Sequence, residues 1–331
     1  MNIAIVILNW NGEHLLKEFL PSVIKYSDGH DIYIVDNASD DNSLRYIHQN
    51  FPNIKTIELD KNYGYAGGYN EAVKKIDTEV LCFLNSDVQV TKNWLNPIIE
   101  VFNKNPNTRI IQPKILDHKN PCQFEYAGAA GGFIDQLGYP YCRGRIFKTI
   151  EKDNGQYDNT CPIFWASGAC FFVRKKTFDM LNGFDASFFM HMEEIDFCWR
   201  AHNAGFGVSY VGNAKVYHLG GASLSKPNAK KTYYNFRNSL YALVKNSHHP
   251  LFLIVFTRLL LDGIAGLSFL FSGKYQHTLA IIKAHGKFYK TWPKLLKFRK
   301  NQQRKAYKGE KSIVWSYFIK RKRFFRTLNN H

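Results

Sequence analysis

Strand-like and helix-like patterns alternate four times between residues 3 and 112, and this alternation restricts the fold more than any other feature of the sequence. The apolar runs 3–8, 32–35, 54–59 and 80–84 have the length of buried strands, and the segments between them carry helical spacing. We therefore predict an α/β fold with a Rossmann-like mixed sheet flanked by helices. In such sheets the carboxyl ends of the strands line the ligand crevice.

Polar side chains follow two of these runs. The run 80–84 ends in Asn85-Ser86-Asp87, and the run 32–35 ends in Asp36. At the carboxyl edge of a sheet, Asp87 would suit a divalent cation that in turn holds a diphosphate, and Asp36 could accept hydrogen bonds from a base or ribose. Turn or helix-capping roles explain both residues about equally well. The glycine-rich loop 64–68 fits neither the dinucleotide fingerprint nor the P-loop.

A second group of acidic residues comprises Glu193, Glu194 and Asp196, at the start of a predicted helix. The helix dipole favours carboxylates in a first turn, but three carboxylates among aromatic residues also suit a general base whose pKa is tuned by burial. His218 ends a short predicted strand, where a structural role is more common than metal ligation. The apolar run 164–173 predicts a strand, and residues 115–160 predict loops and hairpins to which no chemistry can be assigned.

The charge of the chain is concentrated in its last segment. Residues 274–331 hold 17 basic residues and one acidic residue, Glu310, so they carry nearly all of the net charge of +17. The six cysteines have neither CxxC nor zinc spacing, and we expect reduced thiols in the cytosol. The chain opens on a predicted strand without a basic region or cleavage site, so we expect no signal peptide.

The apolar stretch 250–272 precedes this basic segment and is long enough to span a bilayer. Arg258 and Asp262 lie one helical turn apart in its middle, where burial in lipid would be costly. We therefore predict a helix that lies in the membrane interface, with basic residues facing anionic headgroups. A true span, a re-entrant hairpin and a helix packed on the body of the protein stay open as alternatives.

Taken together and in order, these motifs resemble family 2 glycosyltransferases, which are inverting enzymes of the GT-A fold, and most closely their bacterial rhamnosyltransferase-like branch. The resemblance covers roughly residues 1–245. It is carried by six motifs together with His218 and Arg237-Asn238: Asn9-Trp10-Asn11-Gly12, Val35-Asp36-Asn37-Ala38-Ser39, 62–70, Leu84-Asn85-Ser86-Asp87, Ser167-Gly168-Ala169 and 188–200.

The resemblance implies a role for each matching position. Asp36 matches the carboxylate that recognises the nucleotide base, and Asp87 matches the metal ligand of a DxD-type motif in which Asn85 replaces the first Asp. His218 matches a histidine that helps to hold the metal or diphosphate, and Glu194 matches the catalytic base. Glu194 stands where Asp is usual, so the role could fall to Glu193, but we favour Glu194. The remaining donor-side positions are Asn9, Asn70 and Ser86, and the acceptor side comprises Trp165, Ser167, Gly168, Glu193 and Asp196.

The implied domains are a GT-A domain over 1–245 and a helical, basic, membrane-associating region over 246–331. Within the first domain, 1–114 would bind the nucleotide-sugar and 115–245 would hold the acceptor and the base. The expected cofactor is Mg²⁺ or Mn²⁺, and the expected donor is dTDP-rhamnose or a UDP-sugar. The acceptor would be a glycan or a polyprenyl-diphosphate-linked sugar in cell-surface polysaccharide synthesis, reached from the cytoplasmic face of an anionic membrane.

Two rival hypotheses follow from the residues. The basic tail, interleaved with aromatic residues, could bind nucleic acid, and the nucleotide-binding half could be a catalytically inactive scaffold. The apolar stretch 250–272 argues against nucleic acid as a partner, and the carboxylates Asp87 and Glu194 argue against an inactive scaffold.

Overall fold

The protein is built around one mixed sheet, described here from a computed structural model that covers residues 1–220, 228–300 and 303–328. The strands of this sheet have the order β11-β13-β6-β12-β4-β1-β2-β3, and β5 pairs with β13. Their bounds are β1 Ile3–Asn9, β2 Asp31–Asp36, β3 Lys55–Glu58, β4 Val80–Asn85, β5 Val88–Val90, β6 Thr108–Asp117, β11 Thr160–Pro162, β12 Cys170–Arg174 and β13 Gly207–His218.

The first half of the chain forms the parallel part of this sheet, as the alternating pattern predicts. β1 pairs in parallel with β2 and β4, and β2 pairs in parallel with β3. One face is covered by helices α1, α2 and α4, and the other by α3, α5 and α6. These helices are α1 Glu13–Tyr26, α2 Ser43–Asn50, α3 Gly64–Val73, α4 Asn96–Lys104, α5 Lys175–Met180 and α6 Glu193–Asn203.

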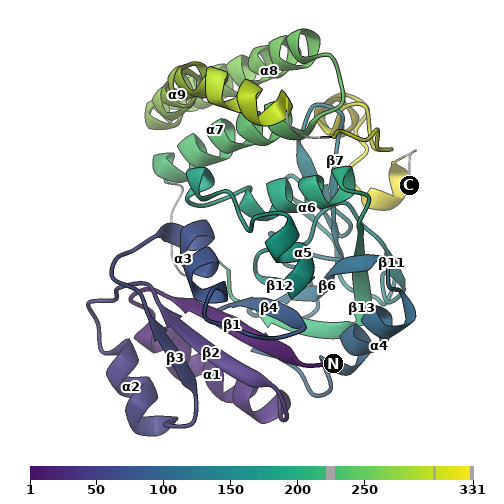
Figure 1. The fold of residues 1–331 in the computed structure, drawn as a ribbon. Helices are drawn as coiled ribbons and strands as arrows, with labels where there is room; N and C mark the ends of the chain where they lie inside the picture. Colours follow the sequence, from purple (N-terminus) through teal and green to yellow (C-terminus); the bar gives the residue numbers. More distant parts are fainter. Residues whose placement is uncertain (221–227, 301–302, 329–331) are drawn as a thin grey trace.

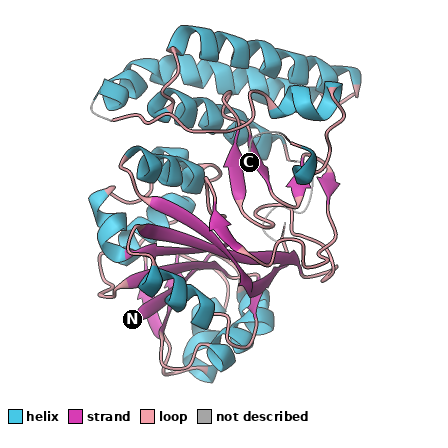
Figure 2. Cartoon of the chain, turned by 90° about the vertical axis from the view of Figure 1, so that its right-hand side faces the viewer, coloured by secondary structure: helices cyan, strands magenta, loops and turns pink. Residues whose placement is uncertain are grey.

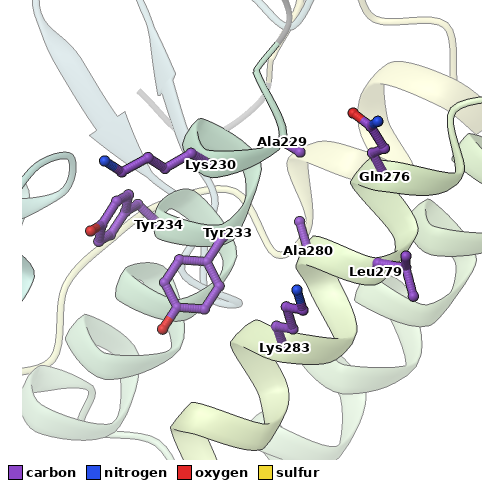
Figure 3. A pocket seen from close by; sticks show the side chains of 8 residues that line it. All are labelled: Ala229, Lys230, Tyr233, Tyr234, Gln276, Leu279, Ala280 and Lys283. Carbon is purple, nitrogen blue, oxygen red and sulfur yellow. The ribbon is translucent and has the colours of Figure 1, made fainter.

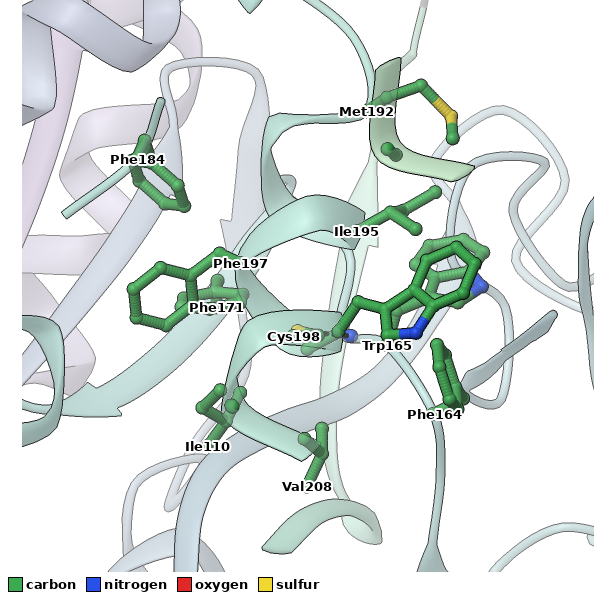
Figure 4. Packing of buried hydrophobic residues seen from close by; sticks show 14 of the residues in the cluster. Ile110, Phe164, Trp165, Phe171, Phe184, Met192, Ile195, Phe197, Cys198 and Val208 are labelled. Atoms are coloured by element: carbon green, nitrogen blue, oxygen red, sulfur yellow. Dashed lines mark hydrogen bonds between the residues drawn. The ribbon is translucent and has the colours of Figure 1, made fainter. Parts of the chain in front are cut away.

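The second half of the chain completes the same sheet. β12 lies between β4 and β6 and is antiparallel to both, while β13 runs parallel to β6. Residue 114 is therefore not a structural boundary, because β6 continues through it to Asp117 and strands from both halves alternate across the sheet. α6 presses Ile195, Phe197 and Cys198 into the aromatic core around Phe171 (Figure 4).

The strand predicted over 164–173 is wrong in its first part, since β12 begins only at Cys170. The indole of Trp165 lies against Gly132, and its Nε1 donates to the Phe133 carbonyl at 2.8 Å. The Ser167 amide donates to the Gln112 side chain at 2.8 Å. These side-chain contacts replace a regular strand ladder, so the apolar run indicates burial here and not extended pairing.

Residues 115–160 form the hairpins that the sequence predicts. They contain a small antiparallel sheet of order β10-β9-β8-β7, which packs beside the main sheet. Its strands are β7 Gly132–Ile134, β8 Pro140–Cys142, β9 Arg145–Ile146 and β10 Thr149–Ile150. All six cysteines are free thiols, as expected.

Three long helices form a layer at one end of the molecule (Figures 1 and 2): α7 Ala229–Asn246, α8 Leu251–Phe271 and α9 Tyr275–Lys300. The chain then returns to the small sheet, where the Ile313 amide donates to Asp135 and the Gln136 amide donates to the Glu310 carbonyl. The basic C-terminal region is therefore helical in its first part, and its last part is packed on the body of the protein.

α8 is two-sided. Its polar pair faces the protein, where Arg258 Nε lies 2.9 Å from Asp262 Oδ1 and Arg258 Nη2 donates to Ser239 at 2.7 Å. Its other side is apolar and solvent-exposed. α8 is the one described helix long and apolar enough to cross a membrane, and 28% of its most apolar window is buried in the protein. The exposed apolar side chains of this helix are Phe252, Leu253, Phe256, Leu260, Ile264, Leu267, Leu270 and Phe271.

The buried pair allows a matched stability test. Asp262→Ala would leave the Arg258 guanidinium buried without its partner, and we expect it to lower the free energy of unfolding by about 3–5 kcal/mol. Asp179 also pairs with a basic residue four positions away, Lys175, but its side chain is 53% exposed. Asp179→Ala should change the free energy by no more than about 0.5 kcal/mol. Urea unfolding measures both, and similar losses in the two variants would contradict this account of α8.

Candidate active site

The carboxyl ends of β1, β2 and β4 bring predicted donor-side residues to one edge of the sheet. Asn9 stands opposite Asp36 in the register of β1 with β2, and Leu8 stands opposite Asn85 in the register of β1 with β4. Asn9 Nδ2 donates to Asp36 Oδ1 at 3.1 Å, and the Ser39 amide donates to Asp36 Oδ2 at 2.9 Å. Asp36 is therefore fixed in orientation, with a lone pair left on each oxygen for a ligand.

Asp87, which follows β4, lies beside His218 at the end of β13. Asp87 Oδ1 is 3.1 Å from His218 Nε2, and Asn85 Nδ2 is 3.4 Å from the same nitrogen. On the other side of the imidazole, Nδ1 lies 3.4 Å from Glu125 Oε1. All three members of this Asp87–His218–Glu125 cluster are buried. Two elements far apart in sequence thus place a carboxylate and an imidazole side by side at this edge of the sheet.

The electrostatics of this cluster are those of a buried ion pair. Burial alone would raise the pKa of Asp87, but the hydrogen bond and charge of His218 outweigh it and hold that pKa below its usual value. Burial would lower the pKa of His218, yet Asp87 and Glu125 raise it to about 10. With no cation bound, His218 thus favours the protonated form and balances two carboxylates. To ligate a cation through Nε2 it would have to release that proton.

The side chains of this cluster supply some, but not all, of the ligands that a hard divalent cation requires. The 3.1 Å between Asp87 Oδ1 and His218 Nε2 is close to the separation of two neighbouring ligands in an octahedral Mg²⁺ or Mn²⁺ shell. Glu125 behind the ring is the kind of partner that orients a ligating histidine. Within the described residues no group of three or more His, Cys, Asp or Glu side chains is arranged as a complete metal site. A cation here would therefore need most of its ligands from a bound diphosphate and water, as Mg²⁺ commonly does.

Glu193 and Glu194 open helix α6. One oxygen of each carboxylate, Oε2, is buried and has no hydrogen-bond partner among the described residues. Burial raises the pKa of Glu194 to about 7, although backbone amides at the start of the helix oppose the shift. Burial, and then the charge of Glu194, raise the pKa of Glu193 well above its usual value. Burial therefore favours the protonated form of both carboxylates, more strongly at Glu193, and Glu194 is the member better placed to accept a proton from a substrate.

The backbone that leads into these carboxylates is strained and tightly held. Phe189, His191 and Met192 have φ values of 64°, 66° and 74°, a region that side chains other than glycine rarely adopt. Asn238 of α7 donates its amide to three carbonyl oxygens of this turn, at 2.7–3.0 Å from the side-chain nitrogen. Arg237 Nη2 donates to the Phe188 carbonyl at 3.0 Å. α7 thus fixes the turn that aims Glu193 and Glu194.

Comparison with known protein families shows which family the chain belongs to. The model of glycosyl transferase family 2 matches residues 4–178, more than half of the chain. The chain belongs to glycosyl transferase family 2. The match contains the Asp36 and Asp87 motifs and β12, while the Glu193–Glu194 pair, His218 and the C-terminal helices lie beyond it.

Relatives of this family 2 transferase are found in archaea and bacteria. The low-salt glycan biosynthesis hexosyltransferase Agl10 of Haloferax volcanii is 23% identical over 249 residues, which cover 73% of this chain and 75% of that protein. The N-acetylglucosaminyl-diphospho-decaprenol L-rhamnosyltransferase of Mycobacterium tuberculosis is 25% identical over 205 residues, or 56% of this chain and 66% of that protein.

Solved structures establish the fold as GT-A. GalNAc-T7 with UDP, GalNAc and Mn²⁺ superposes with a TM-score of 0.57 at 17% identity, covering 74% of this chain and 48% of that one. Staphylococcus aureus TarS 1-349 with UDP-GlcNAc also gives 0.57, at 15% identity, covering 90% of this chain and 84% of that one. The predicted fold class and family are thereby confirmed.

Three of the predicted site residues are used to hold this family 2 fold together. The buried Asp196 carboxylate accepts from Arg200, Lys245 and Asn246, so it joins α6 to α7 and does not face an acceptor. Asn70 uses both ends of its amide on the backbone of Phe184. The buried indole of Trp165 is bonded to the Phe133 carbonyl. The polar atoms of all three residues are paired within the protein, which argues against direct polar contacts with a donor or acceptor, and their predicted site roles stay predictions.

The other residues predicted for the acceptor side and the donor side lie closer to the carboxylates of Glu194 and Asp87. Gly168 is next to Glu194, whose charge its backbone amide stabilises, and its carbonyl accepts from the Tyr65 hydroxyl at 2.7 Å. Ser167 is buried, and its hydroxyl accepts from the Ala169 amide. Asn85 and Ser86 are partly exposed at the crevice edge beside the buried Asp87.

Two further residues of the site were not singled out by the sequence, although Tyr65 lies within the motif 62–70. Glu125 comes from the aperiodic segment 115–160, and only the fold places it behind His218. Tyr65 belongs to the glycine-rich helix α3 and lies within the electrostatic reach of Glu193 and Glu194. Burial raises the pKa of Cys142, and the charges of Glu125 and Glu194 raise it further. The Asp87–His218–Glu125 cluster and the Glu193–Glu194 pair therefore flank one region of the molecule.

Glu194 should give this family 2 transferase a stability that depends on pH. Its pKa rises from 4.5 in the unfolded chain to about 7 in the folded one, so the folded state holds an extra proton between these values. The ionised carboxylate then destabilises the fold progressively from pH 4.5 to pH 7 and fully above it. Glu194→Gln removes this cost. Its stability relative to wild type should rise over that window by on the order of 2–3 kcal/mol and stay constant above pH 7.

Urea unfolding at pH 5, 6, 7 and 8 measures this difference. Glu18→Gln, an exposed position on α1, is the matched control and should follow the wild type at every pH. A constant offset between Glu194→Gln and the wild type would show that Glu194 ionises normally in the folded protein.

Proposed function

We propose that the protein is an inverting, cation-dependent glycosyltransferase that moves a sugar from a nucleoside-diphosphate donor to a hydroxyl of a glycan or lipid-linked acceptor. The observation that carries this proposal is the buried, partnerless oxygen of Glu194 on α6, in a family 2 fold whose crevice also holds Asp87 and His218. A raised pKa near neutrality is what a general base requires.

The donor would lie along the carboxyl ends of β1, β2 and β4. Asp36, anchored by Asn9, has lone pairs available for the base or ribose. Asn85, Ser86 and Asp87 would face the diphosphate. The UDP, UDP-GlcNAc and GDP-mannose in structures of the same fold support a nucleotide-sugar donor. The rhamnosyltransferase relatives favour dTDP-rhamnose, with UDP-sugars as the next choice.

Asp87 and His218 would hold a divalent cation, with Glu125 orienting the imidazole. When bound, Mg²⁺ or Mn²⁺ supplies positive charge that stabilises the departing diphosphate. The Mn²⁺ in two structures of the same fold supports this choice of ion.

The residues of α6 would perform the proton transfer. Glu194 Oε2 accepts the proton of the acceptor hydroxyl while the hydroxyl oxygen forms a bond to the anomeric carbon. The bond between that carbon and the phosphate oxygen breaks, and the nucleoside diphosphate leaves with the electron pair. A single in-line displacement of this kind inverts the anomeric carbon and requires no nucleophile from the protein.

The acceptor is proposed to be attached to a polyprenyl diphosphate, as in the mycobacterial relative. α9 lies against α8 and also exposes apolar side chains, Tyr275, Leu279 and Ile282, which are 50–61% exposed. Exposed apolar side chains on two neighbouring helices, with lysines along α9, fit an anionic membrane better than nucleic acid. We therefore place the protein in the cytoplasm, on the inner face of the cell membrane, and the region 246–331 would make the membrane contact.

The cation site gives the first test. UDP, GDP and dTDP are each added at the same concentration, with and without Mn²⁺ or Mg²⁺, and the melting temperature is recorded. One of them should stabilise the wild type more than the others in the presence of the cation, by about 2.7 kcal/mol once its concentration reaches 100 times its Kd. Asp87→Asn should lose the cation-dependent part, whereas Asp77→Asn, at an exposed position, should keep it. Equal stabilisation of Asp87→Asn and wild type would remove Asp87 from the site.

The base gives the second test. Glu194→Gln should lower kcat for sugar transfer by about 10²–10⁴-fold, the usual contribution of a general base, while nucleotide binding is retained. Below pH 7 the wild-type rate should fall tenfold per pH unit, because the base must be ionised. Glu193→Gln distinguishes the two carboxylates. If it alone abolished turnover while Glu194→Gln remained active, Glu193 would be the base.

A further inference from the structure

A hollow of about 620 Å³ lies between the first turns of α7 and α9, and neither Glu193 nor Glu194 lines it. Two lysines, two tyrosines, the amide of Gln276 and three small or apolar side chains line it, and none of its lining residues is acidic. α7 contributes Lys230, Tyr233 and Tyr234, and α9 contributes Leu279, Ala280 and Lys283 (Figure 3).

This hollow adjoins the strained turn that carries the base. The Tyr234 ring stacks on Phe189 with ring centroids 5.9 Å apart, and Phe189 is the first of the left-handed residues before Glu193. Arg237, one helical turn along α7, lies over the Tyr234 ring at 4.9 Å and holds the Phe188 carbonyl. A ligand in the hollow would therefore be separated from the catalytic helix by this turn alone.

The same hollow adjoins the apolar surface of the helical layer. Leu279 lines it and is also 50% exposed on α9, in a row with Tyr275 and Ile282. An apolar chain lying along this row would reach the hollow at Leu279. There a headgroup would meet Lys230 and Lys283, and the charge of Lys231 is near enough to lower the pKa of His191.

We propose that this hollow binds the diphosphate and first isoprene units of a polyprenyl-diphosphate-linked acceptor. Lys230 and Lys283 would neutralise the diphosphate, and Leu279 with the tyrosine rings would contact the prenyl chain. The sugar attached to the diphosphate would then extend past the turn 189–192 toward Glu194. This inference rests on the proposed function, for which it names the acceptor site. In this proposal Lys230 and Lys283 bind the acceptor and take no part in the sugar-transfer step.

Farnesyl diphosphate, a water-soluble prenyl diphosphate, is the probe for the full-length protein. We expect calorimetric binding to wild type, and at least tenfold weaker binding to the double variant Lys230→Ala/Lys283→Ala. The control Lys287→Ala/Lys290→Ala removes the same charge from exposed positions of α9 that do not line the hollow, and its affinity should stay within twofold of wild type. Farnesol and inorganic diphosphate should each bind at least tenfold more weakly than the probe, because each lacks half of the recognised group.

Three outcomes would overturn the inference: equal affinity of the first double variant and wild type, equal losses in both double variants, or loss of probe binding in Asp87→Asn. Equal losses would indicate general charge attraction, and the third outcome would place the probe in the donor site. Anionic vesicles containing phosphatidylglycerol separate headgroup attraction from acceptor binding, because both double variants should lose vesicle affinity equally. The proposed function fails separately if no nucleoside diphosphate binds while lysine-dependent probe binding persists.

Discussion

The three hydrogen bonds from Asn238 to the turn before α6 are the interaction on which the catalytic arrangement depends. A segment with three left-handed residues would relax if nothing opposed the strain, and Glu193 and Glu194 would move with it. α7 opposes it from one side with Arg237 and Asn238. α7 is also tied to α6 through Asp196 and Lys245 and to α9 through the Tyr241–Thr291 hydrogen bond. The Glu193–Glu194 pair is therefore positioned by the helical layer as much as by the sheet.

This dependence explains why the chain does not divide at residue 245. Lys245 is buried between Asp185 and Asp196, and Asn246 donates to the same Asp196 carboxylate. A division at residue 245 would remove Asn246 from the Asp196 carboxylate and would separate α7 from α9, to which it is joined by the Tyr241–Thr291 hydrogen bond. The helical layer is part of the transferase core, and any membrane contact it makes is mechanically connected to the turn that holds Glu194.

Sequence patterns were sufficient to predict where a residue lies whenever its own strand or helix determines that position. The ends of β1, β2 and β4, the carboxylates at the start of α6 and His218 at the end of β13 all lie where the periodicity and the family resemblance predict. The patterns failed where a long-range contact decides. Asp196 and Asn70 are polar residues in motif positions, but partners 50 and 114 residues away occupy them. Glu125 is the opposite case. It lies in a segment without clear periodicity, and only the fold brings it close to His218.

The Arg258–Asp262 pair holds α8 on the protein and also leaves the apolar side of this helix exposed. Within the apolar stretch the two charges argue against a span, and the structure turns both toward the protein, where Ser239, Tyr139 and the Leu137 carbonyl complete their hydrogen bonds. The charges fix the rotation of α8 about its axis, since turning it would bury the apolar side and expose the pair. That rotation leaves Phe252, Phe256 and Leu260 pointing outward. The polar pair thus stabilises the layer and at the same time determines which side of α8 is available to a membrane.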